Sequence, residues 1–549
     1  MAHIRPGPSA ADRVYIRHEH ADDLKRPLMP DFRDISKFAV PRTMRAFGVT
    51  SRAGVVNDTA KDALENTASG IDGLLFGGAE QYTVKLRDER LNDREDVKAY
   101  AAHMAETLNG ALRTPRSGFE SARQKAMQSA VGFGVLCIYS EDRPGHHHLS
   151  LRTVSAAKLF LLPNDEQNLP SGVQVKTELT ARAAVDKFKA MPGSSLPQKV
   201  LDSADDEKRA GDKFEFIHEV RPDPDGKGPF AFRSSYVCTS GEKHMVAEGG
   251  YHEQPYHVAR WMGDEDSPWG WSPGHTALPT IKRVNTVGRT DLKAGHRIVE
   301  PAFYTTAGAF KGRVDRRPDK ITFMAKPLRG QNPYEIREWP GPKGLAFGLE
   351  IERNLEERIH KLFYSDLLDV PLSPSMTATE YLGRVQQMMR RMGSPVGNIE
   401  NELALPLGRR GFNLLWRARA FDFDAMPDVL RGLGPDDFQV EFISPLERAQ
   451  KAKEAESILH TAEGIAILDK VSPGARDLFD GDAAARRLAA ANRAPEDIIR
   501  DVETVTAMRD ARAQAASADT QVEMAERAVD GLSTLAQAQG ALRQTETAH

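Results

Sequence analysis

The sequence is poor in the residues on which secreted and membrane proteins commonly depend. Its 549 residues include two cysteines, Cys137 and Cys238, about a hundred residues apart. This spacing provides neither a CxxC metal site nor a disulfide framework, so we expect buried thiols in a reducing compartment. No apolar run approaches the ~18 residues of a membrane helix, and the charged N-terminus has no signal-peptide core. We therefore expect a soluble protein that is made in a cytosol and does not contact a membrane.

The chain also lacks the common motifs of nucleotide binding and hydrolysis. It contains no GxxxxGK[ST], no GxSxG and no GxGxxG. HEQPY, starting at His252, lacks the second histidine of HExxH, and on an extended strand His252 and His257 point to opposite faces. The histidines at 146–148 follow a DRPG turn. We predict no catalytic residue, no cofactor and no metal site, with a hydrolase that uses these histidines as an alternative hypothesis.

Hydrophobic periodicity predicts a helical block followed by a strand-rich block. A helix is expected within 57–78, because apolar residues recur at steps of four, four, three and four. These residues are Ala60, Leu64, Ala68, Ile71 and Leu75. Residues 149–262 hold short β-prone runs such as FEFIHEV and SSYVCT between Gly/Pro turns. Within them, GYHEQPYHVARW predicts a half-buried strand that Pro255 interrupts, and hence an edge or bent strand. The fold class is therefore α+β.

Two long helices are expected further along the chain. They cover 275–300 and 344–368, and they flank a basic insert at 301–343 that is rich in Pro and Gly. Each has an apolar stripe, with Ile281 and Val284 on the first helix and Leu355 and Ile359 on the second. This order is typical of a hairpin that projects from a body. More helices follow the single strand FQVEFIS.

Lys and Arg are unevenly distributed in a chain whose net charge is −4. Residues 282–297 carry five Lys/Arg against one Asp, residues 311–343 nine against four, and residues 384–419 seven against two. An acidic chain that gathers cations in its middle is typical of a protein that faces a polyanion there. Solvated helix faces or salt bridges between subunits explain the same pattern, so both interpretations stay open.

Six separated stretches together resemble the head-to-tail connecting (portal) proteins of short-tailed, T7-like bacteriophages. They follow the family's order over roughly residues 31–460, and the most specific is EGGYHEQPYHVARWMGDEDSPWGWSPGHTALPTIKRVN. The others are FRDISKFAVPRTMRAF, NDTAKDALENTASGIDGLLFGGAEQYTVKL, SAVGFGVLCIYSED, MTATEYLGRVQQMMRRMGSPVGNIENELALPL and FQVEFISPLERAQKAKE. The sequence departs from the family at GAEQYTVKL, where an aromatic PWF is common, and in the insert, which matches poorly.

The resemblance implies a portal-type subunit with an α/β wing, a two-helix stem, a small clip insert and a helical crown. The ranges would be 1–30 for an N-terminal arm, 31–274 for the wing (helical, then strand-rich), 275–300 for the first stem helix, 301–343 for the clip, 344–368 for the second stem helix, 369–445 for the channel loop and wing helices, and 446–549 for the C-terminal crown.

The resemblance also implies a function without chemistry. Portal proteins form a ring, usually of twelve subunits, at one capsid vertex, through which double-stranded DNA is packaged and ejected. The expected partners are other copies of the chain, DNA bound without sequence preference, terminase, tail adaptor or nozzle proteins, and capsid and scaffolding proteins. The expected location is the virion, after synthesis in the bacterial cytoplasm. The alternative hypothesis is another phage ring or tail-tube structural protein that contacts DNA but has no stem hairpin.

Residue roles follow from the same resemblance. The candidates for facing the channel and its DNA are Leu372, Ser373, Ser375, Lys282, Arg289 and Lys293. The candidates for binding partners at the clip are Arg313, Arg316, Arg317, Lys320 and Arg329. The stem residues Ile281, Val284, Leu355 and Ile359 are expected to pack against neighbouring subunits. Tyr251, Tyr256 and Trp261 would be wing packing anchors, which leaves His252 and His257 as incidental polar positions.

Overall fold

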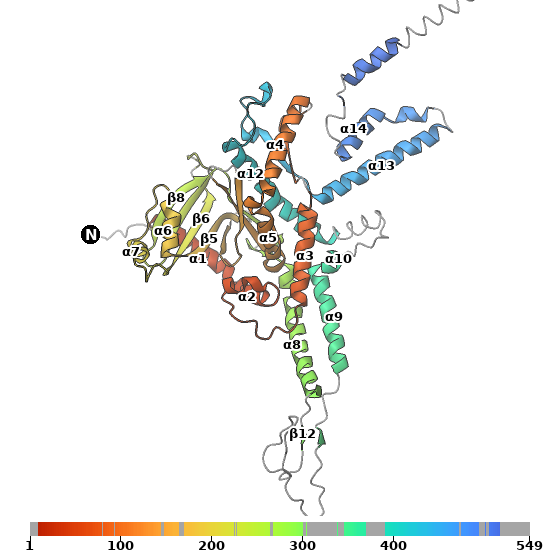
Figure 1. Cartoon of the computed structure of the whole chain (residues 1–549). Coiled ribbons are helices and arrows are strands. Elements are labelled where there is room, and N and C mark those ends of the chain that lie inside the picture. The colour runs from red at the N-terminus through yellow and green to blue at the C-terminus, as the bar shows by residue number, and fades with distance from the viewer. Residues whose placement is uncertain are drawn as a thin grey trace, which may run out of the picture. The chain divides into compact units, whose positions relative to one another are not determined.

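The computed structural model divides the chain into two compact units, Met1–Glu447 and Arg448–His549. In the part of the chain that the structure describes, the first unit holds all the strands and most of the helices, so the predicted mixture of helix and strand is confirmed (Figure 1). The described residues are 9–78, 81–92, 94–143, 148–163, 170–223, 226, 228–263, 267–299, 303–304, 337–338, 345–368, 390–470, 474–492, 500 and 504–515.

The first unit begins with a block of helices. Ser9 caps the first of them, because its Oγ accepts a hydrogen bond from the Asp12 N–H at 3.1 Å. All five apolar residues of the helix expected within 57–78 are buried on one face of α3. The helices are α1 (Ala10–Lys25), α2 (Met29–Phe38), α3 (Thr59–Phe76), α4 (Glu95–Arg113) and α5 (Phe119–Phe133).

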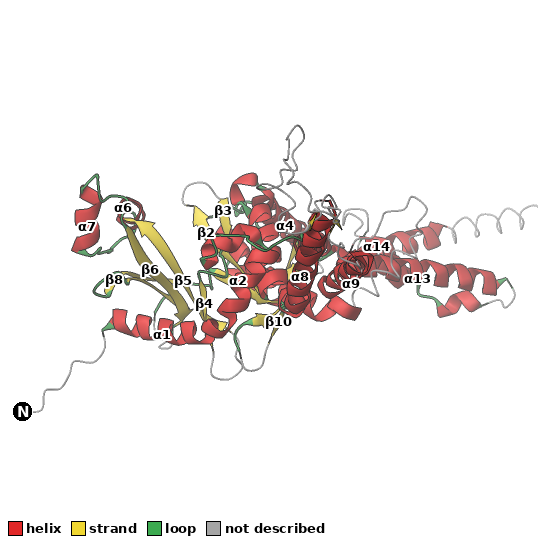
Figure 2. Cartoon of the chain, turned by 90° about the horizontal axis from the view of Figure 1, so that it is seen from below, coloured by secondary structure: helices red, strands yellow, loops and turns green. Residues whose placement is uncertain are grey.

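A five-stranded antiparallel sheet follows, with helices on both faces (Figure 2). Its strands, in spatial order, are β4 (Leu159–Pro163), β5 (Pro170–Thr180), β6 (Lys213–Pro222), β7 (Phe232–Cys238) and β8 (His244–Tyr251). Phe216 faces α6 (Ala181–Lys189) and α7 (Gln198–Asp205), whereas Ile217 faces α1. Because both faces are covered, six of the seven residues of FEFIHEV are buried, whichever face of the sheet they point to.

A second, three-stranded sheet has the order β3-β2-β9, and β9 is at its edge. Its strands are β2 (Val135–Arg143), β3 (His148–Thr153) and β9 (Tyr256–Arg260). The segment GYHEQPYHVARW is thus interrupted at Pro255, and its second part is an edge strand, as expected, but the expected half-burial is wrong for β9. Pro255 lies between two strands of different sheets, β8 and β9, and four of the five residues of β9 are buried. Pro255 has no N–H to donate to a ladder, which suits a position between strands.

Short strand pairs complete the first unit. They are β1 (Tyr82–Leu86) with β14 (Phe438–Phe442), β10 (Met262–Gly263) with β11 (Gly270–Trp271), and β12 (Phe303–Tyr304) with β13 (Arg337–Glu338). Gly134, just before β2, and Gly270 of β11 lie in close contact. A Cβ on either glycine would collide with the carbonyl oxygen of the other. Gly134 also has a φ of +78°, which favours glycine.

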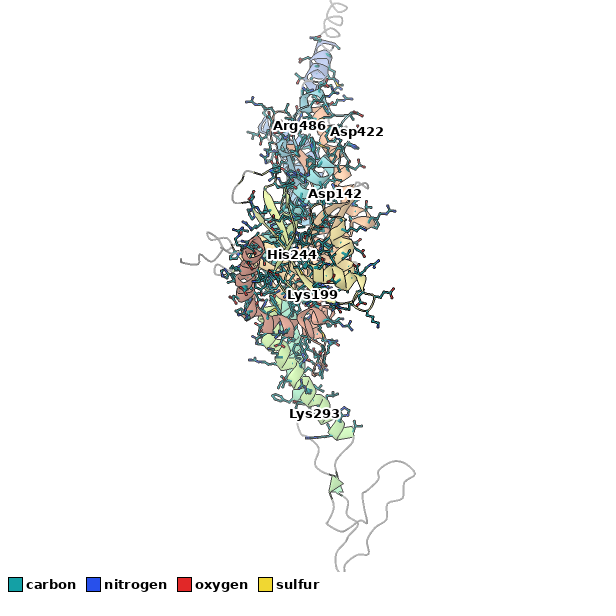
Figure 3. The ribbon with its side chains drawn as sticks, turned by 90° about the vertical axis from the view of Figure 1, so that its left-hand side faces the viewer. Asp142, Lys199, His244, Lys293, Asp422 and Arg486 are labelled. Carbon is teal, nitrogen blue, oxygen red and sulfur yellow. The ribbon has the colours of Figure 1, made fainter. Side chains whose placement is uncertain are left out.

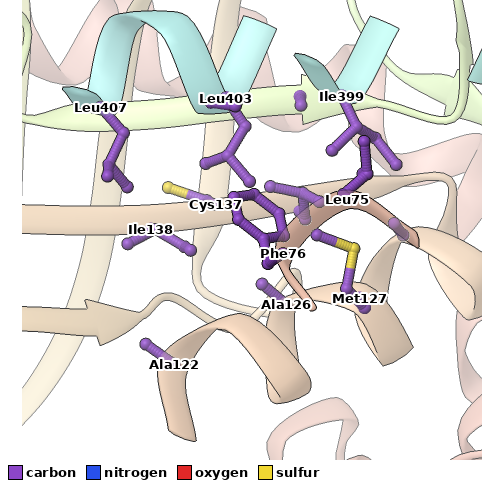
Figure 4. Packing of buried hydrophobic residues seen from close by; sticks show 14 of the residues in the cluster. Leu75, Phe76, Ala122, Ala126, Met127, Cys137, Ile138, Ile399, Leu403 and Leu407 are labelled. Atoms are coloured by element: carbon purple, nitrogen blue, oxygen red, sulfur yellow. The ribbon is translucent and has the colours of Figure 1, made fainter. Parts of the chain in front are cut away.

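One large core joins the helical block to the three-stranded sheet. Leu75 and Phe76 of α3, Met127 of α5, Ile138 of β2 and Leu403, which lies just before α12 (Leu405–Arg417), meet in it (Figure 4). Cys137 is buried in the same core, and Cys238 is buried beneath α6 and α7, as the sequence predicts for both thiols.

Two long helices, α8 (Pro273–Val299) and α9 (Leu345–Phe363), form a hairpin. The single helix expected over 344–368 is broken at Tyr364, which has a φ of +63° and separates α9 from α10 (Ser365–Leu368). Ser365 stabilises the break, because its Oγ lies 2.8 Å from Nδ1 of His360.

A further long helical segment contains a π-helical turn. Helical residues 390–399 continue through the turn Glu400–Ala404 into α12 (Leu405–Arg417). Pro406 explains the turn, since proline has no N–H for the carbonyl of Glu402 four residues earlier and its ring would clash with that carbonyl.

The second unit is helical throughout its described part. Its elements are α13 (Pro445–Asp469), which begins at the end of the first unit, α14 (Gly481–Asn492) and a helical stretch at 504–515. Arg509 joins the last two, because its Nη2 donates to Oδ1 of Asp482 at 2.8 Å.

Candidate functional site

At two levels of the α8–α9 hairpin, a glycine of one helix faces a carboxylate of the other. A Cβ at Gly288 of α8 would lie 2.8 Å from Oε1 of Glu352, and one at Gly348 of α9 would collide with the carboxylate of Asp291. The two glycines therefore leave room for these carboxylate side chains between the helices.

The base of the hairpin is fixed to the helical block by the segment before α3. Oδ1 of Asn285 accepts hydrogen bonds from the N–H groups of Val56 (2.9 Å) and Asn57 (3.2 Å). The Asn57 amide in turn donates to Oε1 of Glu356 at 2.7 Å. Thr67 of α3 donates to the carbonyl oxygen of Phe363 at 2.6 Å. These bonds place both helices of the hairpin against the same part of the body.

The two halves of the hairpin differ in burial. In the half near the body, Ile281, Val284 and Ile359 are fully buried in the core of their own subunit, and Leu355 is partly buried. The prediction that these stripes pack against neighbouring subunits is therefore wrong for the three buried residues. The body fills the space beside them, because α3 also packs on α9.

The other half of the hairpin exposes apolar side chains. Val299, the last residue of α8, is 81% exposed, and the four larger apolar side chains are 55% (Leu292), 47% (Ile298), 66% (Phe347) and 45% (Leu349) exposed. Exposed leucines are common singly, but four large apolar residues at the same end of one hairpin are typical of an interaction surface. We call these four residues the distal apolar set.

The three basic candidates on α8 have different surroundings. Lys282 pairs with Asp34 at 2.6 Å, and Nη2 of Arg289 donates to the carbonyl oxygen of Gly54 at 3.0 Å. Lys293 is exposed on the distal half of α8 (Figure 3). The cations nearest the body are thus engaged within the subunit, and Lys293 is the more accessible charge.

The remaining candidates fall outside the described residues. They are the clip residues Arg313, Arg316, Arg317, Lys320 and Arg329 and the channel-loop residues Leu372, Ser373 and Ser375.

The aromatic segment before α8 lies at the junction of the two sheets. Tyr256 and Trp261 are buried and Tyr251 is half-buried. The Tyr256 hydroxyl lies 2.6 Å from Nδ1 of the buried His218, whose Nε2 lies 3.0 Å from the Ser234 hydroxyl. Tyr256 of β9 thereby links the three-stranded sheet to β6 and β7 of the five-stranded sheet.

The description of the two histidines as incidental polar positions is wrong for His257. Its side chain is buried, and Nε2 lies 2.8 Å from the Ser140 hydroxyl. Burial, with a smaller effect of Arg410, lowers the pKa of His257 to about 3. His252 lies instead against Phe230, with ring centroids 5.0 Å apart. Among the described residues no group of three or more His, Cys, Asp or Glu side chains is placed to hold a metal ion.

A network of charges ties α12 to the same junction. Arg417 forms a bidentate pair with Glu253 at 2.7 and 2.8 Å, and Arg410 and Asn413 donate to the same carboxylate at 3.1 and 2.9 Å. Burial alone would raise the pKa of Glu253, but Arg417, Asn413 and Arg410 outweigh burial and lower it. Glu402 makes a second tie, since its carboxylate accepts from the N–H (2.9 Å) and Nη2 (2.8 Å) of Arg260.

Sequence reasoning missed both of these charged contacts, that of Glu253 with α12 and that of Glu402 with Arg260. Glu402 lies 142 residues from Arg260, and Arg417 lies 164 residues from Glu253, so no local pattern connects them. The nearest signal was Pro406 within an apolar helical pattern, because such a proline often marks a π-turn or kink.

As for membranes, none of the described helices is both long and apolar enough to span a bilayer.

Comparison with known proteins identifies the family. The portal protein of Salmonella phage epsilon15 is 24% identical over 313 residues, which cover 56% of this chain and 55% of that protein. The probable portal protein of Bordetella phage BPP-1 is 22% identical over 477 residues, which cover 83% of this chain and 82% of that protein. The match thus spans about half the length of the first relative and most of the second.

Two solved structures are also similar. They are the neck of an empty gene transfer agent particle (TM-score 0.40, 12% identity, 81% of this chain and 92% of that chain) and the virion of a native gene transfer agent particle (TM-score 0.32, 12% identity, 72% and 89%). The family model described as the bacteriophage head to tail connecting protein matches residues 11–499. Because this match covers most of the sequence, the chain belongs to the bacteriophage head to tail connecting protein family.

Proposed function

We propose that the chain is a portal subunit, which forms a closed ring at one capsid vertex and passes double-stranded DNA. The observation that carries this proposal is the α8–α9 hairpin with its distal apolar set. A hairpin that exposes four large apolar residues far from its own core needs a partner to cover them. Identical subunits that meet head to tail cover such surfaces around a ring and leave no free interface.

The parts of the portal are assigned along the chain as follows. Residues 1–30 are the arm, 31–274 and 369–445 the wing with its channel loop, 275–300 and 344–368 the stem, 301–343 the clip and 446–549 the crown. The pairing of β12 with β13 supports a clip that both leaves and returns to the stem, because these strands lie at the two ends of the insert.

The mechanism is geometric. DNA passes through the ring, where Lys293, Leu372, Ser373 and Ser375 provide contacts that read no sequence. A lining of small, weakly polar side chains binds phosphates weakly, which allows movement in both directions. Terminase and later tail adaptor or nozzle proteins dock on the clip, while capsid and scaffolding proteins surround the wing. The ring, of twelve subunits, is a virion component and catalyses no reaction.

Negative-stain electron microscopy of the purified protein tests the proposal. We expect rings with a central hole in top views and a narrow stem below a wider body in side views. Rings without the stem would favour the alternative, another phage ring or tail-tube protein. A metal-dependent nuclease activity of the purified chain, abolished by replacing His252 and His257, would favour a hydrolase.

A further inference from the structure

A cavity of about 400 Å³ lies between the first two helices and the start of β4. Helix α1 lies next to this strand, and α2 follows α1 along the chain (Figure 2). The cavity is lined by Asp22, Lys25, Arg26, Met29, Pro30, Arg33, Ala157 and Phe160. Three of these eight side chains are cationic and one is anionic, so the lining carries an excess of positive charge.

The deepest of the three cations is Lys25, which is only 1% exposed. Its Nζ donates to the carbonyl oxygens of Ala157 (2.7 Å) and Leu159 (2.8 Å) and lies 4.1 Å from the centroid of the Phe160 ring. Lys25 forms no ion pair with any residue that the structure describes. Burial of an ammonium group without an anion is costly. Accordingly, burial lowers the pKa of Lys25 to about 7, against a smaller opposing effect of Asp22.

The other two cations differ in their partners. Arg26 is already engaged, with ion pairs to Asp22 at 3.0 Å and Asp23 at 2.8 Å. Arg33 is exposed and forms no ion pair with the described part of the chain. The single carboxylate in the lining is thus used by Arg26, which leaves Lys25 and Arg33 beside the cavity without a negative partner.

We propose that this cavity binds a compact tetrahedral oxyanion, of the phosphate or sulfate class, between Lys25 and Arg33. The arginine would supply paired N–H donors, and the ammonium group would supply the third donor that two carbonyl oxygens leave free. Met29, Pro30 and Phe160 would shield the ion from water. This site is separate from the hairpin and does not depend on ring formation.

The competing explanation is that Lys25 is uncharged and has only a structural role, as a hydrogen-bond donor to the backbone. A neutral amine has two N–H groups, and two carbonyl oxygens satisfy them. The two explanations differ in whether Lys25 gains a proton when the anion binds, because an anion stabilises the charged ammonium form. Above pH 7, binding would then be accompanied by proton uptake. The other charged groups near Lys25 are Asp22 and His18 on α1, Arg26, and Arg33 on α2, and no charged side chain of β4 faces it.

Isothermal titration calorimetry of the full chain with sulfate at pH 8 tests the proposal. Sulfate is suitable because it neither gains nor loses a proton at this pH. Two buffers with different ionisation enthalpies give the number of protons taken up. We expect saturable binding with uptake of up to about one proton per chain. Absence of saturable binding, or binding without proton uptake, would overturn the proposal.

Variants locate the site. Arg33→Gln changes an exposed residue and should weaken sulfate binding about tenfold, as expected for a lost charge-assisted contact. Lys25→Met should abolish proton uptake. Arg13→Gln removes an exposed charge from α1 outside the lining and should bind as the unmodified chain does. Equal affinity for Arg33→Gln and Arg13→Gln would refute the site.

A further titration identifies the source of the anion. Sulfate is titrated into the chain in the presence of a short DNA duplex. Loss of sulfate binding would assign the site to a backbone phosphate, whereas unchanged binding would assign it to a free anion. Both results keep the oxyanion site, and neither bears on the portal assignment.

Discussion

Glu402, in the π-helical turn, binds both the backbone N–H and the guanidinium of Arg260 at the end of β9. The Arg260 side chain is 8% exposed and that of Glu402 23%. One carboxylate therefore fixes the edge strand of the small sheet to the long helical segment 390–417. The contact joins the two parts of the first unit that lie on either side of the hairpin in the sequence.

Removing this contact should destabilise the subunit. Glu402→Ala leaves the buried Arg260 charge unpaired, so we expect a loss of about 3 kcal/mol in the free energy of unfolding. Glu402→Gln keeps an acceptor for the backbone N–H and should lose about half as much. Urea unfolding of both variants measures the difference, and equal losses would mean that the charge contributes nothing.

Acid should destabilise the fold through His257. Its pKa is about 3 in the folded chain and 6.5 as the unperturbed value. At a pH between these two pKa values, only the unfolded chain binds this proton. The contribution of His257 to the free energy of unfolding is therefore fully present above pH 6.5 and falls as the pH drops toward 3. From pH 7 to pH 5 this histidine should cost about 2 kcal/mol. His257→Gln should remove that part of the loss in urea unfolding at each pH. The exposed His20→Gln is the control, and identical acid slopes for both variants would contradict the assignment.

Charged substitutions in the two halves of the hairpin should have different effects. In the distal half they should block assembly, and in the half near the body they should block folding. Leu349→Asp places a charge in the distal apolar set, so we expect unchanged unfolding of the subunit, within about 0.5 kcal/mol, but no rings. Ile359→Asp should instead prevent folding, because it buries an unpaired charge in the subunit's own core. Size-exclusion chromatography and thermal unfolding distinguish the two effects. Asn354→Asp adds the same charge at an exposed polar position of α9 and should form rings. Normal rings from Leu349→Asp would exclude this surface from the interface.

The clip should bind partners through its cations. Deleting 311–337, or replacing Arg313, Arg316 and Arg317 by Gln, should leave rings intact and abolish binding of terminase and the tail adaptor. Pull-down with each partner measures the effect. If the deleted form retained both partners, the docking surface would lie elsewhere.

The channel loop should control DNA retention. Ser373→Arg or Ser375→Arg would add a belt of positive charge around the ring, which should slow ejection without affecting assembly. Packaged DNA and ejection are measured in phage that carry each change. Normal packaging, retention and ejection in both would show that the loop does not face DNA.

The sequence allowed prediction of elements whose signal is local. The apolar face of α3 and the two long helices follow a 3.6-residue period, and FEFIHEV and SSYVCT have β propensity, so each element could be predicted independently. The break at Tyr364 was missed, because a left-handed tyrosine gives no compositional signal.

Long-range contacts could not be predicted in this way. His257 is in a strand that reads as alternating, and only the position of Ser140 on the neighbouring strand shows that the histidine is buried and bonded. Likewise, the burial of Ile359 depends on α3, which is almost 300 residues earlier in the chain. The site therefore depends on which faces of these elements the fold covers, and periodicity alone does not specify that.

The pairing of β1 with β14 has a consequence for synthesis on the ribosome. Tyr82 lies opposite Phe442, so β1 has no strand partner until residue 442 has left the exit tunnel. Until then, the nascent chain carries an unpaired strand edge, which is prone to pair with other chains. Completion of the first unit should therefore be a late event, and truncated chains that end before β14 should aggregate. Only subunits that include β14 would then be available for assembly.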